Sequence, residues 1–278
     1  RDRSLVFGVG KNDVWDRRAR TAHPKPVCRI DLGLPEDGAS ASGDGPRPPR
    51  HHLSLERAEL VTSARGPEIT SRVQKDRNVI FLRLSESNQP TVLRLNRPPD
   101  QTGTDIRPPR LRVDDLTGII VQTVPPEATY PDGFAYAVAA RVEAAPAPRA
   151  DCGEIRWEID RDAVLALAVA TSREAERPEE AALRLLEDAL AAGEADLRER
   201  HLRRWADYWG RSWIKIDDRE LQELWYQWMY VFGSATSPEA EAPGLFSPWI
   251  LNDKTKWKGA YTIDYNFEQT YAAALSSN

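Results

Sequence analysis

Prolines are distributed very unevenly along this chain, and their distribution constrains its fold more than any other feature. Of 21 prolines, 17 lie before residue 150. Proline removes a backbone donor and breaks helix interiors, so the first half is expected to consist of strands and loops. The last third, where prolines are few, is expected to be helical. The sequence therefore predicts a β domain followed by helices.

Short apolar or alternating runs, separated by turn residues, fill the first 171 residues. Strands of this length, repeated with turn signals between them, are typical of a β-sandwich. We predict strands over residues 4–9, 26–34, 53–60, 68–73, 79–84, 91–95, 118–124, 134–142 and 163–170.

The composition changes after residue 171. Pro178, followed by two glutamates, predicts the start of a helix, because proline fits the first turn and acidic side chains favour the positive helix end. Gly193 predicts its end. A second helix follows, on which Trp205, Tyr208 and Trp209 have the spacing of one aromatic face.

A third helix is predicted behind Asp217-Asp-Arg-Glu220, which has the form of a capping box with Asp in place of Ser or Thr. Its apolar side chains recur along one face over three turns and are expected to form part of a core. Few residues follow to cover that face, so a barrel of helix pairs is its natural completion. The face consists of Leu221, Leu224, Trp225, Trp228, Met229 and Phe232.

Composition excludes several classes of function. A net charge of −5 gives no reason to expect a nucleic acid or an anionic membrane as partner, and no apolar run approaches the ~20 residues of a membrane span. Cys28 and Cys152 could pair or stay free. No Cys and His cluster predicts a metal, and His51-His52 is expected to be a solvated loop. We expect neither a metal nor a cofactor.

The chain begins Arg-Asp-Arg, and its one methionine is Met229. We therefore expect a piece of a longer protein, cut at both ends. A missing leader could have been a secretion signal, which slightly favours a secreted or periplasmic location. Oligomeric state is not indicated.

Residues 249–266 carry the densest functional signal. They contain two Trp, two Tyr, two Asn and two Asp within eighteen residues. Aromatic rings cover the apolar faces of a sugar ring, and short amides and carboxylates bind its hydroxyl groups. The sequence therefore predicts a sugar site. Its candidate substrate-binding residues are Trp249, Asn252, Asp253, Trp257 and Tyr261.

Asp264 and Asn266 are the candidate catalytic residues, near the start of a predicted short helix. A purely structural interpretation stays open beside this one. Asp264 could cap the helix, and the aromatic side chains of the segment could belong to a core.

Five strings of the sequence carry a family resemblance: Gly244-Leu-Phe-Ser-Pro-Trp249, Trp257-Lys-Gly-Ala-Tyr261, Asp264-Tyr-Asn-Phe267, Gly10-Lys-Asn-Asp-Val-Trp-Asp16 near the N-terminus, and Arg211-Ser-Trp-Ile-Lys-Ile-Asp217. They resemble family 95 glycoside hydrolases, which are α-L-fucosidases and relatives. The order and spacing of the first three match the segment that enters the active site in that family. Two positions differ: Ala260 stands where the family has Asp, and Asp264 stands where it has the first Asn of an Asn-x-Asn motif.

The resemblance implies a multidomain α and β fold: a β-sandwich over residues 1–171, a helical linker over 172–216, and the first helices of an incomplete (α/α)6 barrel over 217–278. It implies hydrolysis of a glycosidic bond in an oligosaccharide or glycan, with inversion. Asp264 and Asn266 take the positions that orient the base and the attacking water. The Glu acid and Asp base are expected after residue 278, so the chain alone is expected to be inactive.

Two other functions stay open. A β-sandwich with an aromatic cleft could bind carbohydrate without hydrolysing it. The aromatic helices could also form an interaction module in which the rings are purely structural.

Overall fold

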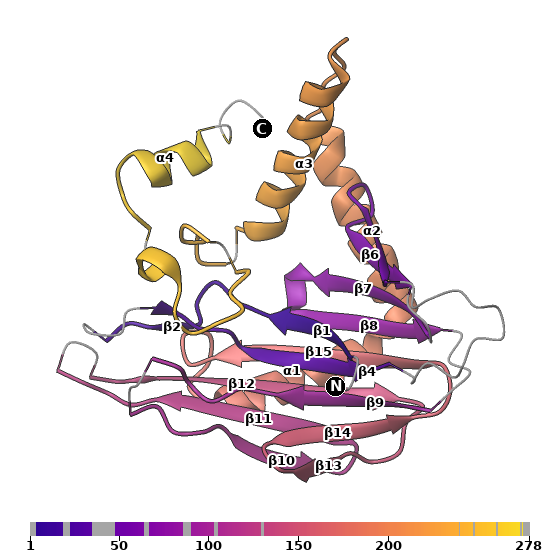
Figure 1. The fold of residues 1–278 in the computed structure, drawn as a ribbon, viewed down its shortest axis with the longest axis vertical. Coiled ribbons are helices and arrows are strands. Elements are labelled where there is room, and N and C mark those ends of the chain that lie inside the picture. Colours follow the sequence, from indigo (N-terminus) through magenta and orange to yellow (C-terminus); the bar gives the residue numbers. More distant parts are fainter. Residues whose placement is uncertain are drawn as a thin grey trace.

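The computed structural model describes residues 4–18, 23–34, 48–63, 67–85, 90–102, 105–128, 131–238, 240–246, 248–259, 261–272 and 274. Strands occupy the chain up to residue 171 and helices follow, as the proline distribution predicts (Figure 1).

Two large antiparallel sheets face each other. The smaller has five strands in the order β1-β4-β9-β14-β13. Its central strands alternate apolar and polar residues, so each places one face in the core. Its strands are β1 (Ser4–Val9), β4 (Cys28–Gly33), β9 (Thr91–Asn96), β13 (Arg149–Asp151) and β14 (Glu154–Ile159).

The larger sheet has eight strands in the order β10-β11-β12-β15-β8-β7-β6-β5. A short pair of strands, β2 (Trp15–Asp16) and β3 (His23–Pro24), lies apart from both sheets. The eight strands are β5 (Arg50–Ser54), β6 (Glu59–Ser63), β7 (Glu68–Gln74), β8 (Val79–Ser85), β10 (Arg110–Asp114), β11 (Thr117–Val124), β12 (Phe134–Glu143) and β15 (Ala163–Thr171).

The main core lies between the sheets and includes Ile30, Leu95, Ile120, Trp157 and Leu165, all buried. The sandwich-like β domain agrees with the prediction. Strands β12 and β15 are buried on both faces, because helix α1 covers the outer face of the larger sheet. Their continuous apolar runs follow from this double burial.

The described helices are α1 (Pro178–Ala192), α2 (Glu194–Arg211), α3 (Arg219–Ala235) and α4 (Tyr265–Tyr271), with 3-10 turns η1 (Lys75–Arg77) and η2 (Lys256–Gly259). Gly193 joins α1 to α2 at a φ of +80°, which glycine adopts without strain. In Figure 1, α3 rises away from the sheets beside α2, and α4 stands apart from both.

Three local predictions are wrong. Residues 53–60 form a hairpin instead of one strand: β5 ends at Ser54, and β6 begins at Glu59 after a turn in which Ala58 has a φ of 47°. The cap of α3 is Asp218 and not Asp217, because the Asp218 carboxylate accepts a hydrogen bond from the Leu221 amide. The histidine pair lies on strand β5 instead of in the predicted loop, but both side chains are exposed, as expected for a solvated pair.

The apolar face of α3 is only partly covered. Trp228 is 64% exposed, and Leu221 and Leu224 are also exposed, whereas Met229 is buried. The barrel itself is not confirmed, since α3 and the short α4 are the helices described after residue 217. Both cysteines are free, Cys28 buried and Cys152 exposed. None of the described helices is both long enough and apolar enough to cross a membrane.

His201 fixes α2 on the β5–β6 hairpin. It is buried, and its Nε2 lies 2.8 Å from the carbonyl oxygen of Arg57, so that nitrogen donates. Burial lowers the pKa of His201, and the hydrogen bond to Arg57 only partly opposes this. The folded chain therefore holds a neutral imidazole in a place where a charged one is costly.

Because the folded pKa of His201 is below its ordinary value, we expect stability to fall as the pH drops below about 6.5, where the unfolded chain takes up the proton first. Above that pH its contribution is fully present. Urea unfolding between pH 7.5 and 5 measures the slope. His201→Gln keeps a donor and should flatten it, although burial lowers the pKa of His23 too and leaves a residual slope. Equal slopes in wild type and variant would contradict this assignment.

Candidate functional site

The segment after α3 returns to the β domain and lies against β1. A Cβ atom at Gly10 would lie 1.7 Å from the carbonyl oxygen of Pro248, and one at Gly8 would lie 2.1 Å from the Leu251 side chain. Only glycine permits so close an approach. Ile250, between the two contacts, is buried. The start of the predicted sugar segment is thus packed onto the sandwich.

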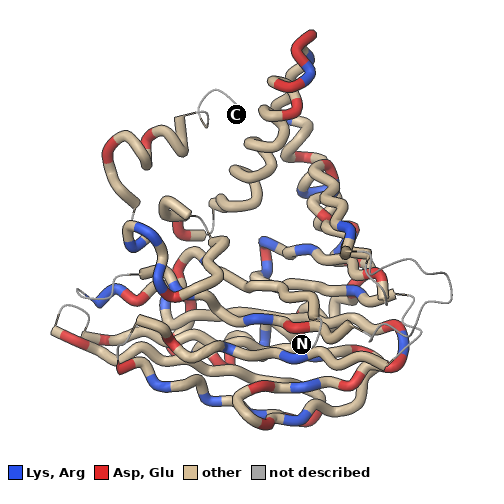
Figure 2. Tube along the Cα trace, viewed as in Figure 1, with Lys and Arg blue, Asp and Glu red and all other residues tan. Residues whose placement is uncertain are grey.

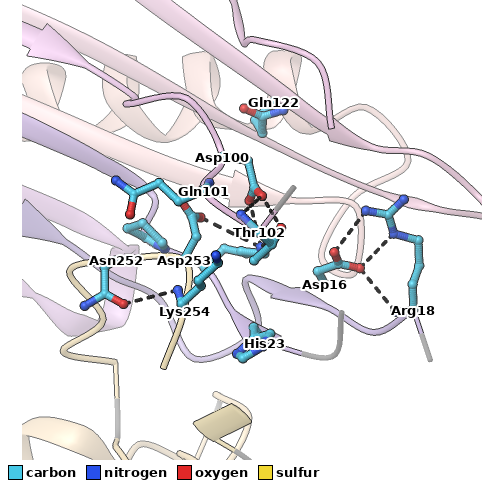
Figure 3. Close-up of polar contacts among 12 residues, drawn as sticks. Asp16, Arg18, His23, Asp100, Gln101, Thr102, Gln122, Asn252, Asp253 and Lys254 are labelled. Carbon is cyan, nitrogen blue, oxygen red and sulfur yellow. Dashed lines mark hydrogen bonds and ion pairs between the residues drawn. The ribbon is translucent and has the colours of Figure 1, made fainter. Parts of the chain in front are cut away.

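A buried charge cluster fixes the same segment (Figure 3). Asp253 accepts from both terminal nitrogens of Arg97, at 2.6 and 3.3 Å. Lys25 donates to Asp100 at 2.7 Å and lies 3.9 Å from Asp253. Side-chain exposure of all four is 3% or less. Two cations and two carboxylates make the cluster neutral, which is the condition under which buried charges are tolerated.

Two neighbouring residues, Tyr136 and Thr102, supply further hydrogen bonds to the cluster. Arg97 Nε donates to the Tyr136 hydroxyl at 3.1 Å, and that hydroxyl donates to the carbonyl oxygen of Val27 at 2.8 Å. Burial alone would raise the pKa of Asp100, but hydrogen bonds from Lys25 and Thr102 outweigh it and bring that pKa to about 2. Burial raises the pKa of Asp253, and Arg97 opposes the rise.

A cavity of 570 Å³ lies beside residues 248–251. Strands β1, β7 and β8 line it on one side, and helices α2 and α3 line it on the other. Trp249, Trp205 and Tyr230 contribute aromatic rings to its lining, and His201 and Ser71 contribute polar groups. Its volume is in the range of small-molecule sites, and an apolar wall with few polar groups is their usual composition.

Tyr261 belongs to a second aromatic group. Its ring stacks on Trp15 at 6.0 Å between centroids with an interplanar angle of 3°, and its hydroxyl donates to the carbonyl oxygen of Ala242 at 2.7 Å. Phe267 and Tyr271 of α4 continue the group, at 5.6 Å from Tyr261 to Phe267 and 4.8 Å from Phe267 to Tyr271. These rings hold α4 near the N-terminal loop.

The N-terminal string 10–16 connects the β domain to the helices. Asn12 donates to the carbonyl oxygen of Ala235, the last residue of α3, at 3.0 Å and to that of Glu241, which follows the helix, at 2.8 Å. Asp13 accepts from the Thr171 hydroxyl at 2.5 Å, at the end of the β domain. The residues that carry the family resemblance at this end of the chain are therefore junction residues.

The other predicted site residues lie on the surface. Trp257 is 75% exposed, and its backbone has a φ of 50°. Asn252 is exposed and accepts from the Lys254 amide at 3.2 Å. Asp264 and Asn266 are exposed at the start of α4. Asp264 stands at the N-cap position with a φ of 153°, and its side chain makes no cap hydrogen bond.

The predicted residues therefore do not share one environment. Trp249 lines the cavity, Asp253 lies in the buried cluster, and Tyr261 joins the aromatic group. The sequence interpretation missed Lys25, Arg97 and Asp100, whose contacts with residue 253 span more than a hundred positions and leave no local pattern. Ala260 lies outside the described residues. In the described part of the chain, no three His, Cys, Asp or Glu side chains are grouped to hold a metal.

No protein-family model matches the chain, and no curated protein matches it in sequence. The fold is similar to that of a solved structure from the human microbiome, a "putative kojibiose phosphorylase", with a TM-score of 0.57 and 11% identity. The likeness covers 84% of this chain and 35% of that one, so the chain spans about a third of the neighbour's length. At this identity the likeness shows the fold.

Proposed function

We propose that this chain is part of a carbohydrate-active enzyme that cleaves glycosidic bonds in an oligosaccharide or glycan. The observation that carries the proposal is the fold likeness to the phosphorylase over 84% of the chain. The exposed Trp257 and the cavity-lining Trp249 support it, since they present rings that a sugar can cover.

The finer proposal is an inverting, α-L-fucosidase-like hydrolysis, with Asp264 and Asn266 orienting the base and the attacking water. Both side chains are exposed and available to such a site. Since the chain spans 35% of its neighbour, we place the general acid and base outside residues 1–278. Hydrolysis and phosphorolysis differ in the acceptor, which is water in one and phosphate in the other.

The test is turnover of aryl glycosides and disaccharides by the protein that contains this chain, with and without phosphate. Turnover of an aryl α-L-fucoside without phosphate supports the hydrolase. Turnover that needs phosphate supports a phosphorylase and contradicts the fucosidase-like proposal. Sugar binding without turnover of any substrate supports the alternative, a non-catalytic carbohydrate-binding protein, which the exposed Trp257 favours.

Sugar affinity gives a separate prediction. Trp257→Ala and Trp249→Ala should each weaken binding by about two- to tenfold, as expected for loss of one stacking ring. Calorimetry with the best substrate or a non-hydrolysed analogue measures the change. Trp213→Ala is the matched control, because Trp213 is about as exposed as Trp257 but lies between α2 and α3, outside both the cavity lining and residues 249–266. Equal affinities in all four proteins would contradict a role for these rings.

A further inference from the structure

A second cavity, of 730 Å³, lies next to the first, and Lys75 and Trp205 line both. It lies between α2, η1 and the C-terminal end of α3. Figure 2 shows basic segments along α2 and at η1. Five cations and two carboxylates line it, a net charge of +3 in a chain whose net charge is −5. They are Lys75, Arg200, Arg203, Arg204 and Arg211, with Asp76 and Asp207.

Most of the positive charge comes from one face of α2. Arg200, Arg204, Asp207 and Arg211 are spaced at i, i+4, i+7 and i+11, so they follow one side of the helix. Like charges four positions apart destabilise a helix. Within the described ranges, no ion pair is found for Arg200, Arg204 or Arg211.

Two of the five cations, Lys75 and Arg203, have structural contacts that account for their charge. The Lys75 ammonium donates to the carbonyl oxygens of Gly233 and Thr236 and so compensates the negative end of α3. Arg203 pairs with Glu199 on the same helix. Among the described residues, no ion pair gives the other three guanidinium groups a comparable task.

We propose that this cavity binds a sugar-sized ligand that carries a phosphate or sulfate group. A guanidinium matches the oxygens of such a group in a two-point contact. Arg200 and Arg204 are separated by about 6 Å along the helix axis, close enough to hold one such group together. Arg211 lies about 10 Å beyond Arg204 along the helix axis. A sugar ring attached to a phosphate held by Arg200 and Arg204 extends over a similar distance. The volume of 730 Å³ exceeds that of a bare ion. The inference does not depend on the proposed glycosidase function.

Calorimetry at low ionic strength tests the proposal with three probes: inorganic phosphate, glucose 6-phosphate and glucose. Wild-type protein should bind both charged probes and not glucose. Arg200→Gln with Arg204→Gln should weaken the binding of both by tenfold or more. The matched control is Arg184→Gln with Arg219→Gln, which removes two exposed arginines outside this cavity.

The probes also distinguish the source of the charged group. Tighter binding of glucose 6-phosphate than of phosphate supports a phosphorylated sugar, whereas equal binding contradicts the sugar-sized ligand and indicates a site for the oxyanion alone. The melting temperatures of the variants and of wild type should be equal, which shows that a variant that no longer binds the probes is still folded. The proposal is overturned if neither charged probe binds wild type, if glucose binds as tightly, or if the control pair weakens binding as much.

Discussion

Replacing Asp253 by alanine is expected to lower the free energy of unfolding by about 3–5 kcal/mol, the range for breaking a buried ion pair from one side. The Arg97 guanidinium would remain buried, with Asp100 at 3.9 Å as its nearest remaining carboxylate. Lys25 would lose its second carboxylate as well. Urea unfolding measures the global loss, and hydrogen exchange over residues 250–259 shows whether the segment detaches first.

Asp160→Ala is the matched control for this variant. Asp160 pairs with Arg161 at 2.9 Å, but both side chains are more than half exposed. Water screens such an exposed pair, so its loss is expected to change the free energy of unfolding very little. A double replacement of Arg97 and Asp253 by apolar residues should recover part of the loss, because it leaves no unpaired charge. If Asp253→Ala costs no more than Asp160→Ala, the cluster does not hold the segment.

Asn266→Ala is expected to lower turnover by a factor on the order of 10²–10³, the loss of one group that orients the reacting centre. The prediction rests on the proposed hydrolase and concerns the protein that turns over substrate. Stability should hardly change, because Asn266 is exposed and α4 has no buried residue. Rates on a panel of aryl glycosides measure the effect, and the melting temperature serves as the folding control.

Asp264→Asn separates two roles for the neighbouring carboxylate. If Asp264 takes the place of the family's Asn, the variant should retain measurable activity and could change its sugar preference. If Asp264 has become the base, the variant should lose all activity, because an amide accepts no proton. Wild-type rates for both Asn266→Ala and Asp264→Asn on every active substrate would show that this end of the segment is structural.

Much of the β domain could be predicted because local patterns determine it. Strand β4 alternates in sequence as it alternates in burial, and β15 reads as a continuous apolar run because both its faces are covered. The turn at residues 55–58 was missed because it contains neither glycine nor proline, and Ala58 adopts a positive φ there. Strand β14 has the same alternation as β4, with Glu and Arg between its buried Ile155, Trp157 and Ile159, and so could have been predicted from the sequence as well.

The candidate site could be predicted only in part. Aromatic density predicts a sugar site in residues 249–266, and of its two tryptophans Trp257 is exposed and Trp249 lines the cavity. The composition of residues 249–266 does not show which of their side chains are buried. Asp253 was therefore grouped with the sugar-binding residues, although an ion pair with Arg97 holds it in the interior. Tyr261 likewise has a partner, Trp15, from the other end of the chain. Pairings over such separations are set by topology, which a local pattern does not contain.

The buried cluster also has a consequence for the order of assembly. Lys25, Arg97 and Asp100 belong to the sandwich, whereas Asp253 follows Arg97 by 156 residues. The last sandwich strand, β15, ends at Thr171, and Asp253 follows it by 253 − 171 = 82 residues. At a synthesis rate of about 5–20 residues per second, roughly 4–16 s pass between the two. During that interval the completed sandwich carries one uncompensated positive charge at this place, and water has to hydrate it. Asp253 neutralises this charge when residues 248–259 dock on the sandwich. Burial of the cluster is therefore a late step in folding and follows formation of the sandwich.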